Sequence, residues 1–125
     1  MATTEAITTV SLVAAADLSA LQFTAVVANS AGKIAAATIG ANCVGILISK
    51  PVTDQAGTVV TDGIAKIKAG AAVTAGAKVM ADATGRAVTA VGGGTNHVLG
   101  VAMESAAAAG EIIRVLVGNP KPLLA

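Results

Sequence analysis

The chain has 125 residues, enough for one domain with a single hydrophobic core. It is 54% hydrophobic but only 1% aromatic and 12% charged, so we expect a core of small aliphatic residues and a sparsely charged surface covered by neighbours in an assembly. The 8 basic and 7 acidic residues are scattered, which argues against nucleic-acid binding, and the short, interrupted apolar stretches argue against a membrane protein.

The first part of the chain predicts an extended segment followed by a hairpin. Residues 1–20 are rich in Thr and Ala and predict an N-terminal arm, in which the alanine run at residues 14–16 would allow a short helix. Residues 22–28 and 33–38 predict two strands. The turn Asn29-Ser30-Ala31-Gly32 between them consists of residues that tolerate positive φ.

The rest of the chain also favours short strands separated by Gly-containing turns. The remaining predicted strands are residues 42–50, 58–69, 78–81, 86–90, 97–104 and 111–117. The alanine run at residues 105–110 could form one helical turn, and the two prolines in residues 118–125 predict an extended C-terminal tail. We therefore predict an all-β fold, a compact small barrel or sandwich at residues 21–117 with extended segments at both ends.

An internal duplication is predicted from two pairs of similar segments. Residues 27–34 and 80–87 both read apolar, Ala, Asn or Asp, two small residues, Gly, a basic residue and an apolar residue. Residues 42–46 match residues 96–101 with one insertion. Since hairpins in general share such turn residues, chance similarity is the alternative; we interpret the pattern as two related β-hairpin halves, at about 26–69 and 79–117.

No residue pattern in the sequence predicts catalysis, a cofactor or a metal site. His97 is the only histidine and Cys43 the only cysteine, so a thiol metal cluster and an intrachain disulfide are not expected. Lys78 near Met80 is similar to the lysine hairpin of lipoyl and biotinyl carrier domains, but the hairpin tip here is at residues 82–85. The first five residues lack the features of a signal peptide, so we expect synthesis in a cytoplasm.

A resemblance to a known family rests on three parts of the chain. They are residues 42–47 followed by 59–69, residues 72–88, and residues 99–117. The second part contains the string V-x-x-G-x-x-V-x-A-D-x-x-G-x-A-V. Together these parts resemble the phage capsid decoration, or head cement, proteins of the DUF2190 type.

That resemblance implies a structural protein without catalytic residues. Members of the family are compact β modules that bind the outer surface of an icosahedral phage head, often as trimers, and hold major capsid subunits together. It therefore implies the virion as location, the major capsid protein as partner and a homotrimer as the assembly, without nucleic acid or membrane. This chain departs from many relatives in its low charge and its Thr-rich start.

The two ends of the chain are the predicted contact segments. Extended ends can add a strand to a neighbouring sheet, and many weak contacts repeated around a shell give strong avidity. The candidate contact residues are Thr3, Thr4, Ile7, Val10, Pro120, Pro122, Leu123 and Leu124. Ends without any binding role are the alternative reading of these segments, and a fibre or tail component or a carrier domain modified at Lys78 are the alternative functions.

Overall fold

The computed structural model describes residues 8–92, 96–118 and 123–124, which contain strands and no helix. The strands are β1 (Thr8–Val13), β2 (Thr24–Ala28), β3 (Ile34–Ala36), β4 (Gly45–Leu47), β5 (Ala56–Lys68), β6 (Lys78–Ala81), β7 (Ala87–Thr89), β8 (Asn96–His97), β9 (Gly100–Ala102), β10 (Ile112–Val117) and β11 (Leu123–Leu124). The all-β prediction is therefore confirmed.

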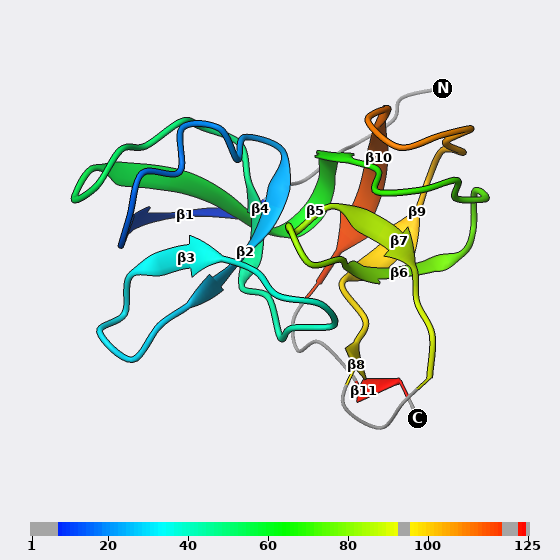
Figure 1. Ribbon diagram of the computed structural model, residues 1–125, viewed down its shortest axis with the longest axis horizontal. Coiled ribbons are helices and arrows are strands. Elements are labelled where there is room, and N and C mark those ends of the chain that lie inside the picture. The colour runs from blue at the N-terminus through cyan, green and yellow to red at the C-terminus, as the bar shows by residue number, and fades with distance from the viewer. Residues whose placement is uncertain (1–7, 93–95, 119–122, 125) are drawn as a thin grey trace.

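Most of these strands form one strongly curled antiparallel sheet. Its order is β3-β2-β4-β5-β10-β9-β6-β7, and β1 pairs with β5 beside this path. β8 and β11 form a separate two-stranded pair. Figure 1 shows β1 to β4 on one side of the molecule and β6, β7, β9 and β10 on the other, with β5 running between them.

The long strand β5 belongs to both sides. Its residues 56–62 pair with β1, and its residues 63–68 pair with β10. Gly63, with a φ of 109°, stands where the pairing changes from one partner to the other. We call residues 8–62 the first half and residues 63–117 the second half.

The two halves repeat the same backbone hydrogen bonds. The matching bonds, each first-half bond followed by its second-half equivalent, are Asn29 N to Lys33 O and Asp82 N to Arg86 O, Val44 N to Val26 O and Leu99 N to Val79 O, and Ala15 N to Ile34 O and Gly70 N to Ala87 O. The two related hairpin halves predicted from the sequence are thus present. The boundaries differ from those expected from sequence: β1 lies outside the predicted repeats, and residues 63–68 of β5, which the prediction includes in the first repeat, are the second-half equivalent of β1.

The start of the described chain differs from the expected arm at residues 1–20. Thr8–Val13 forms β1, which is paired along its length with β5, and the side chains of Ala14 and Leu18 are buried. Neither alanine run is helical: Ala14 forms a bridge with Ile34, Ala106 forms a bridge with Val73, and residues 107–110 form a bend and a turn. Small side chains allow close backbone approach, and sheet pairing here overrides the helix propensity of Ala.

The duplication also accounts for the unusual backbone conformation of Asp54. Among the described residues, Phe23 and Asp54 are the non-glycine residues with positive φ, at 63° and 66°. Asp54 N donates to Ala14 O, as Gly110 N donates to Ala69 O in the second half. Gly110 has a φ of 92°, so glycine occupies in one half a conformation that Asp54 must adopt in the other.

Replacing Asp54 with glycine is therefore expected to stabilise the protein by about 1 kcal/mol, because glycine adopts positive φ without steric cost. The change also removes the exposed ion pair between Lys33 Nζ and Asp54 Oδ1, 3.1 Å apart, which contributes little. Urea unfolding measures the difference, and Asp54→Asn removes the charge while tolerating the same backbone. A glycine variant less stable than the asparagine variant would contradict the equivalence with Gly110.

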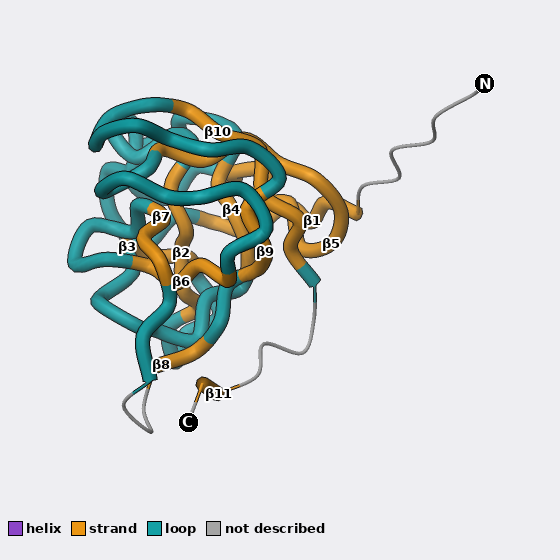
Figure 2. Tube along the Cα trace, turned by 90° about the vertical axis from the view of Figure 1, so that its right-hand side faces the viewer, coloured by secondary structure: helices purple, strands orange, loops and turns teal. Residues whose placement is uncertain are grey.

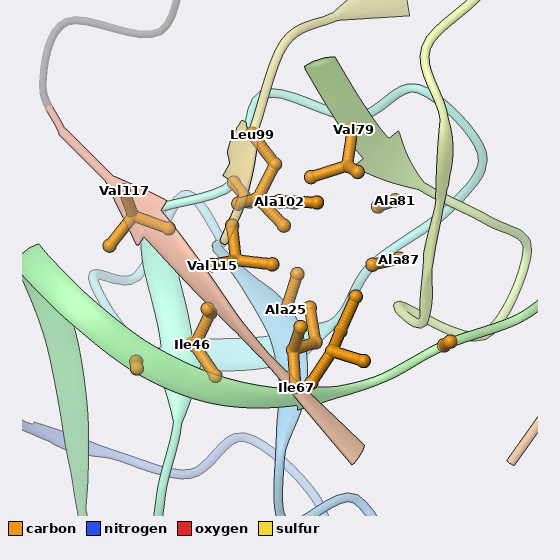
Figure 3. Close-up of a cluster of buried hydrophobic side chains, with 14 of the residues drawn as sticks. Ala25, Ile46, Ile67, Val79, Ala81, Ala87, Leu99, Ala102, Val115 and Val117 are labelled. Carbon is orange, nitrogen blue, oxygen red and sulfur yellow. The ribbon is translucent and has the colours of Figure 1, made fainter. Parts of the chain in front are cut away.

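The hydrophobic core is divided unequally between the halves. A smaller cluster, including Val26, Leu47 and Val59, lies inside the first half. The larger cluster contains the equivalent second-half residues, Val79, Ala102 and Val115, together with residues from the first half. Figure 3 shows Ala25 and Ile46 of the first half in the same cluster as Val79, Leu99 and Val115. Residues of the first half thus cover and complete the hydrophobic core of the second half.

Candidate binding surface

An exposed row of side chains crosses the second half of the sheet. Lys78 on β6 is paired with Val101 on β9, and Val101 is paired with Leu116 on β10. Leu116 is also paired with Ile64 on β5. Directly paired residues point to the same face of a sheet, so these four side chains are neighbours. Leu116 is 45% exposed, and Ile64 and Val101 are half-buried, so these three side chains form a partly open apolar strip with Lys78 at one end.

Basic side chains flank this strip. Lys66 is paired with Arg114, and Lys68 with Ile112, on the same strands and in the same alternation as Ile64 and Leu116. Arg114 Nε lies 3.0 Å from Glu104 Oε1, an exposed ion pair. Four of the eight Lys and Arg residues therefore lie on one face, although they are scattered in the sequence. We call the face formed by these strands the outer face of the second half; its members are Ile64, Lys66, Lys68, Lys78, Val101, Ile112, Arg114 and Leu116.

The equivalent row in the first half is buried. Ala25 is paired with Ile46, and Ile46 with Val60, in the same register as Lys78, Val101 and Leu116. Ala25 and Ile46 are 0% exposed and Val60 is 1% exposed, because all three belong to the larger core cluster. Two faces with the same backbone geometry thus have opposite environments, and only the one on the second half is open.

The predicted contact residues do not gather in one place. Val10 lies on β1, opposite Val59, and is 36% exposed. Leu123 and Leu124 form β11, which pairs with His97 and Asn96 of β8. Figure 2 shows β8 and β11 at the end of the molecule away from β10. The other five candidates, Thr3, Thr4, Ile7, Pro120 and Pro122, lie outside the described residues.

The sequence model of the phage cement protein family matches residues 1–118 of this chain. This chain belongs to that family. The family consists of structural components of phage particles, so the virion is where this cement protein acts. A comparison with curated proteins gives no match.

A solved structure shares the fold of this cement protein. It is the N base of head fibre gp8.5 of bacteriophage phi29, with a TM-score of 0.67 and 17% sequence identity. The likeness covers 94% of this chain and 98% of the fibre base. At this identity the similarity establishes the common fold alone.

In this cement protein, the residues weighed as candidates for catalysis, metal binding or modification take part in ordinary contacts of the fold. Cys43 is buried, and its Sγ donates to Ala41 O at 3.5 Å. His97 Nδ1 lies 3.2 Å from Gly40 O, and its backbone N donates to the same oxygen. Within the described ranges, no three His, Cys, Asp or Glu residues are grouped to hold a metal ion, and no helix is long and apolar enough to cross a membrane. Lys78 lies on β6 rather than at the hairpin tip.

Asp82 organises the turn of the second hairpin. Its Oδ1 accepts hydrogen bonds from the backbone N atoms of Thr84 and Arg86, at 2.8 and 2.9 Å, and its Oδ2 lies 3.1 Å from Arg86 Nε. Partial burial acts to raise the pKa of the carboxyl, but these hydrogen bonds and the nearby guanidinium outweigh it and lower the pKa below 3.8. Asn29 accepts equivalent bonds from Ala31 and Lys33 in the first hairpin.

Because the pKa of Asp82 is lower in the folded state, its contribution to stability is present above the unfolded pKa of about 4 and is lost as the pH falls through the folded value. We expect Asp82→Asn to keep the turn, as Asn29 does, and to reduce the loss of stability between about pH 5 and pH 2. Urea unfolding at a series of pH values measures this. An unchanged pH dependence in the variant would show that other carboxylates account for the acid sensitivity.

The outer face was not identified from the sequence, although a signal was present. Residues 112–117 lie in a predicted strand, and the alternation of side chains along a strand places Ile112, Arg114 and Leu116 on one side of it, which the structure shows as the exposed side. The pairing with Lys66 and Lys68 on β5 depends on the fold, so the cluster of basic residues could not be predicted from strand alternation alone.

Proposed function

We propose that this cement protein is a non-enzymatic decoration protein, which binds the outer surface of a phage head as a homotrimer and stabilises contacts between major capsid subunits. The family match over residues 1–118 carries the proposal. The sparse charge of the chain and its open apolar face support it, because both are typical of surfaces that become covered in an assembly.

The terminal segments are proposed to contact the capsid. The pairing of β11 with β8 supports this role for the C-terminal segment, because that segment is already used as an added strand. Each strand of the pair has only two residues, so few hydrogen bonds hold it and the segment is available for exchange onto another sheet edge. The same role is proposed for residues 1–7 and Val10.

Addition of the purified protein to phage heads that lack it tests the proposal. We expect evenly spaced protrusions over the shell in cryo-electron micrographs and a higher melting temperature of the heads, by mass action of a ligand that binds the intact shell. Chains without residues 1–7 or without residues 119–125 should bind more weakly. Heads that neither bind the protein nor gain heat resistance would overturn the proposal.

A second candidate function is the base of a fibre or other projection. The fold of this chain matches 98% of a chain described as the base of a head fibre, which favours this candidate over a tail component. Micrographs separate the two: long projections that end in additional density favour a fibre base, and low protrusions favour a cement protein. The intact mass of the protein from virions also tests for a modified Lys78, which a carrier domain would require.

A further inference from the structure

The two halves of the chain pack in a head-to-tail manner. The outer face of the first half, with Ala25, Ile46 and Val60, covers the inner face of the second half. On that inner face the residues Ala65, Ile67, Ala81 and Leu99 are buried in the shared cluster. The contact therefore joins two different surfaces of two similar units, which is a heterologous arrangement.

Each half has one surface of this contact that remains open. On the second half, the outer face is open, with Leu116 exposed and Val101 half-buried. On the first half, the inner face is less covered than its equivalent. Its residues Val10, Leu12, Ala28 and Val44 are exposed or half-buried, whereas their equivalents Ala65, Ile67, Ala81 and Leu99 are all buried.

The hairpin turns show the same difference. In the second half, the turn at Gly85 sits directly against the first half: Ala25 N donates to Gly85 O at 2.8 Å, and a Cβ at Gly85 would lie 3.3 Å from Thr24 Cβ. In the first half, the equivalent turn is open, because a Cβ at Gly32 would meet nothing within 4 Å. The residues equivalent to Thr24 and Ala25 are Ala77 and Lys78, which border the open outer face.

We infer that a second copy of this chain covers the outer face of the second half with the inner face of its own first half. This contact repeats between chains the packing that joins the halves within one chain. The intramolecular contact is the observation that selects this occupant, since it pairs the same two kinds of face in the same backbone geometry. The inference deepens the homotrimer in the proposed function, because a heterologous contact that closes on itself gives a ring.

The charges of the outer face are compatible with this contact. Lys66 and Arg114 are equivalent to Ser11 and Thr58 of the first half, of which Ser11 is exposed and Thr58 is half-buried where the halves pack. They would therefore stay at the rim of the interface, in contact with water. Lys78 replaces the central Ala25, but a lysine can bury its aliphatic stem and extend its ammonium group to the edge.

Disulfide formation between two separately purified variants tests the geometry. One carries Gly32→Cys and the other Ala77→Cys, both in a Cys43→Ala background. In the equivalent intramolecular contact, a Cβ at Gly85 would lie 3.3 Å from Thr24 Cβ, close to the Cβ separation of about 3.5–4.5 Å in a disulfide. We expect a covalent dimer on mild oxidation of the mixture. Neither variant alone should form one, as a heterologous contact does not bring identical positions together.

The control pair is Gly32→Cys with Ala107→Cys, because Val52, the residue equivalent to Ala107, lies outside the cluster that joins the halves. Equal cross-linking of the control pair would overturn the inference, and so would a failure of the test pair to cross-link. The double variant Gly32→Cys with Ala77→Cys should form a closed ring in which every thiol is consumed. An open ladder of products would overturn the ring and leave a filament as the assembly.

Sedimentation measures the same contact without cysteines. We expect Leu116→Lys to weaken self-association by about tenfold or more, since it places a charge at the centre of the interface. Val52→Lys, another exposed apolar position, should leave it unchanged. A wild-type chain that stays monomeric at high concentration would overturn the inference. These experiments use no phage heads, so heads that are stabilised by a chain that does not self-associate would contradict this inference alone.

Discussion

Replacing either Gly45 or Gly100 with alanine is expected to destabilise the protein by about 3 kcal/mol, and by the same amount at both positions. A Cβ at Gly45 would overlap the carbonyl oxygen of Val60, and a Cβ at Gly100 would overlap that of Leu116. Each would also lie 3.0 Å from a methyl group, of Val59 in the first case and Val115 in the second. Backbone atoms within a sheet cannot move aside without breaking neighbouring hydrogen bonds, so both strands must shift.

Urea unfolding of the two variants measures these costs. Gly76→Ala is the control for the general effect of removing a glycine: it has a φ of 87° but open space around it, so we expect a cost of only about 1 kcal/mol. A clear difference between the Gly45 and Gly100 variants would contradict the equivalence of the two strands. A cost no larger than that of Gly76→Ala would contradict the close backbone approach.

The duplication could be predicted because its signals are local. Asn29 and Asp82 accept the hydrogen bonds of their own turns, and the glycines three residues later have positive φ. The residues that determine each turn therefore all lie within a few positions of one another in the sequence. The position of β1 could not be predicted in the same way. Thr8–Val13 has few bulky residues, and its place in the sheet depends on pairing with residues 43 or more positions away.

The exposure of the outer face also depends on contacts between residues far apart in the sequence. Ile46 and Val101 occupy equivalent strands in similar sequences, yet one is buried and the other is half-buried. Neither the hydrophobicity nor the alternation of the two segments distinguishes them. The difference arises from the order of packing: the first half covers the inner face of the second, whereas Leu116 on the outer face of the second half stays exposed among the described residues. Sequence periodicity reports that a strand has an apolar face but does not identify what covers it.

Because Val60 is buried and its equivalent Leu116 is exposed, we expect their truncation to alanine to have different effects on the free energy of unfolding. Val60→Ala should cost about 2 kcal/mol, because Val60 is 1% exposed within the cluster that joins the halves. Leu116→Ala should change the free energy of unfolding by no more than about 0.5 kcal/mol in the monomer, because Leu116 is 45% exposed. The larger side chain is thus expected to contribute less, which is the reverse of what size alone predicts.

The protein concentration separates this effect from self-association. Unfolding in dilute solution reports the monomer, where Val60→Ala is the damaging change and Leu116→Ala is nearly neutral. At high concentration the wild-type chain should gain stability by association, and Leu116→Ala should lose part of that gain. If Leu116→Ala were as costly as Val60→Ala in dilute solution, Leu116 would have to be covered within its own chain, and its face would not be open for a partner.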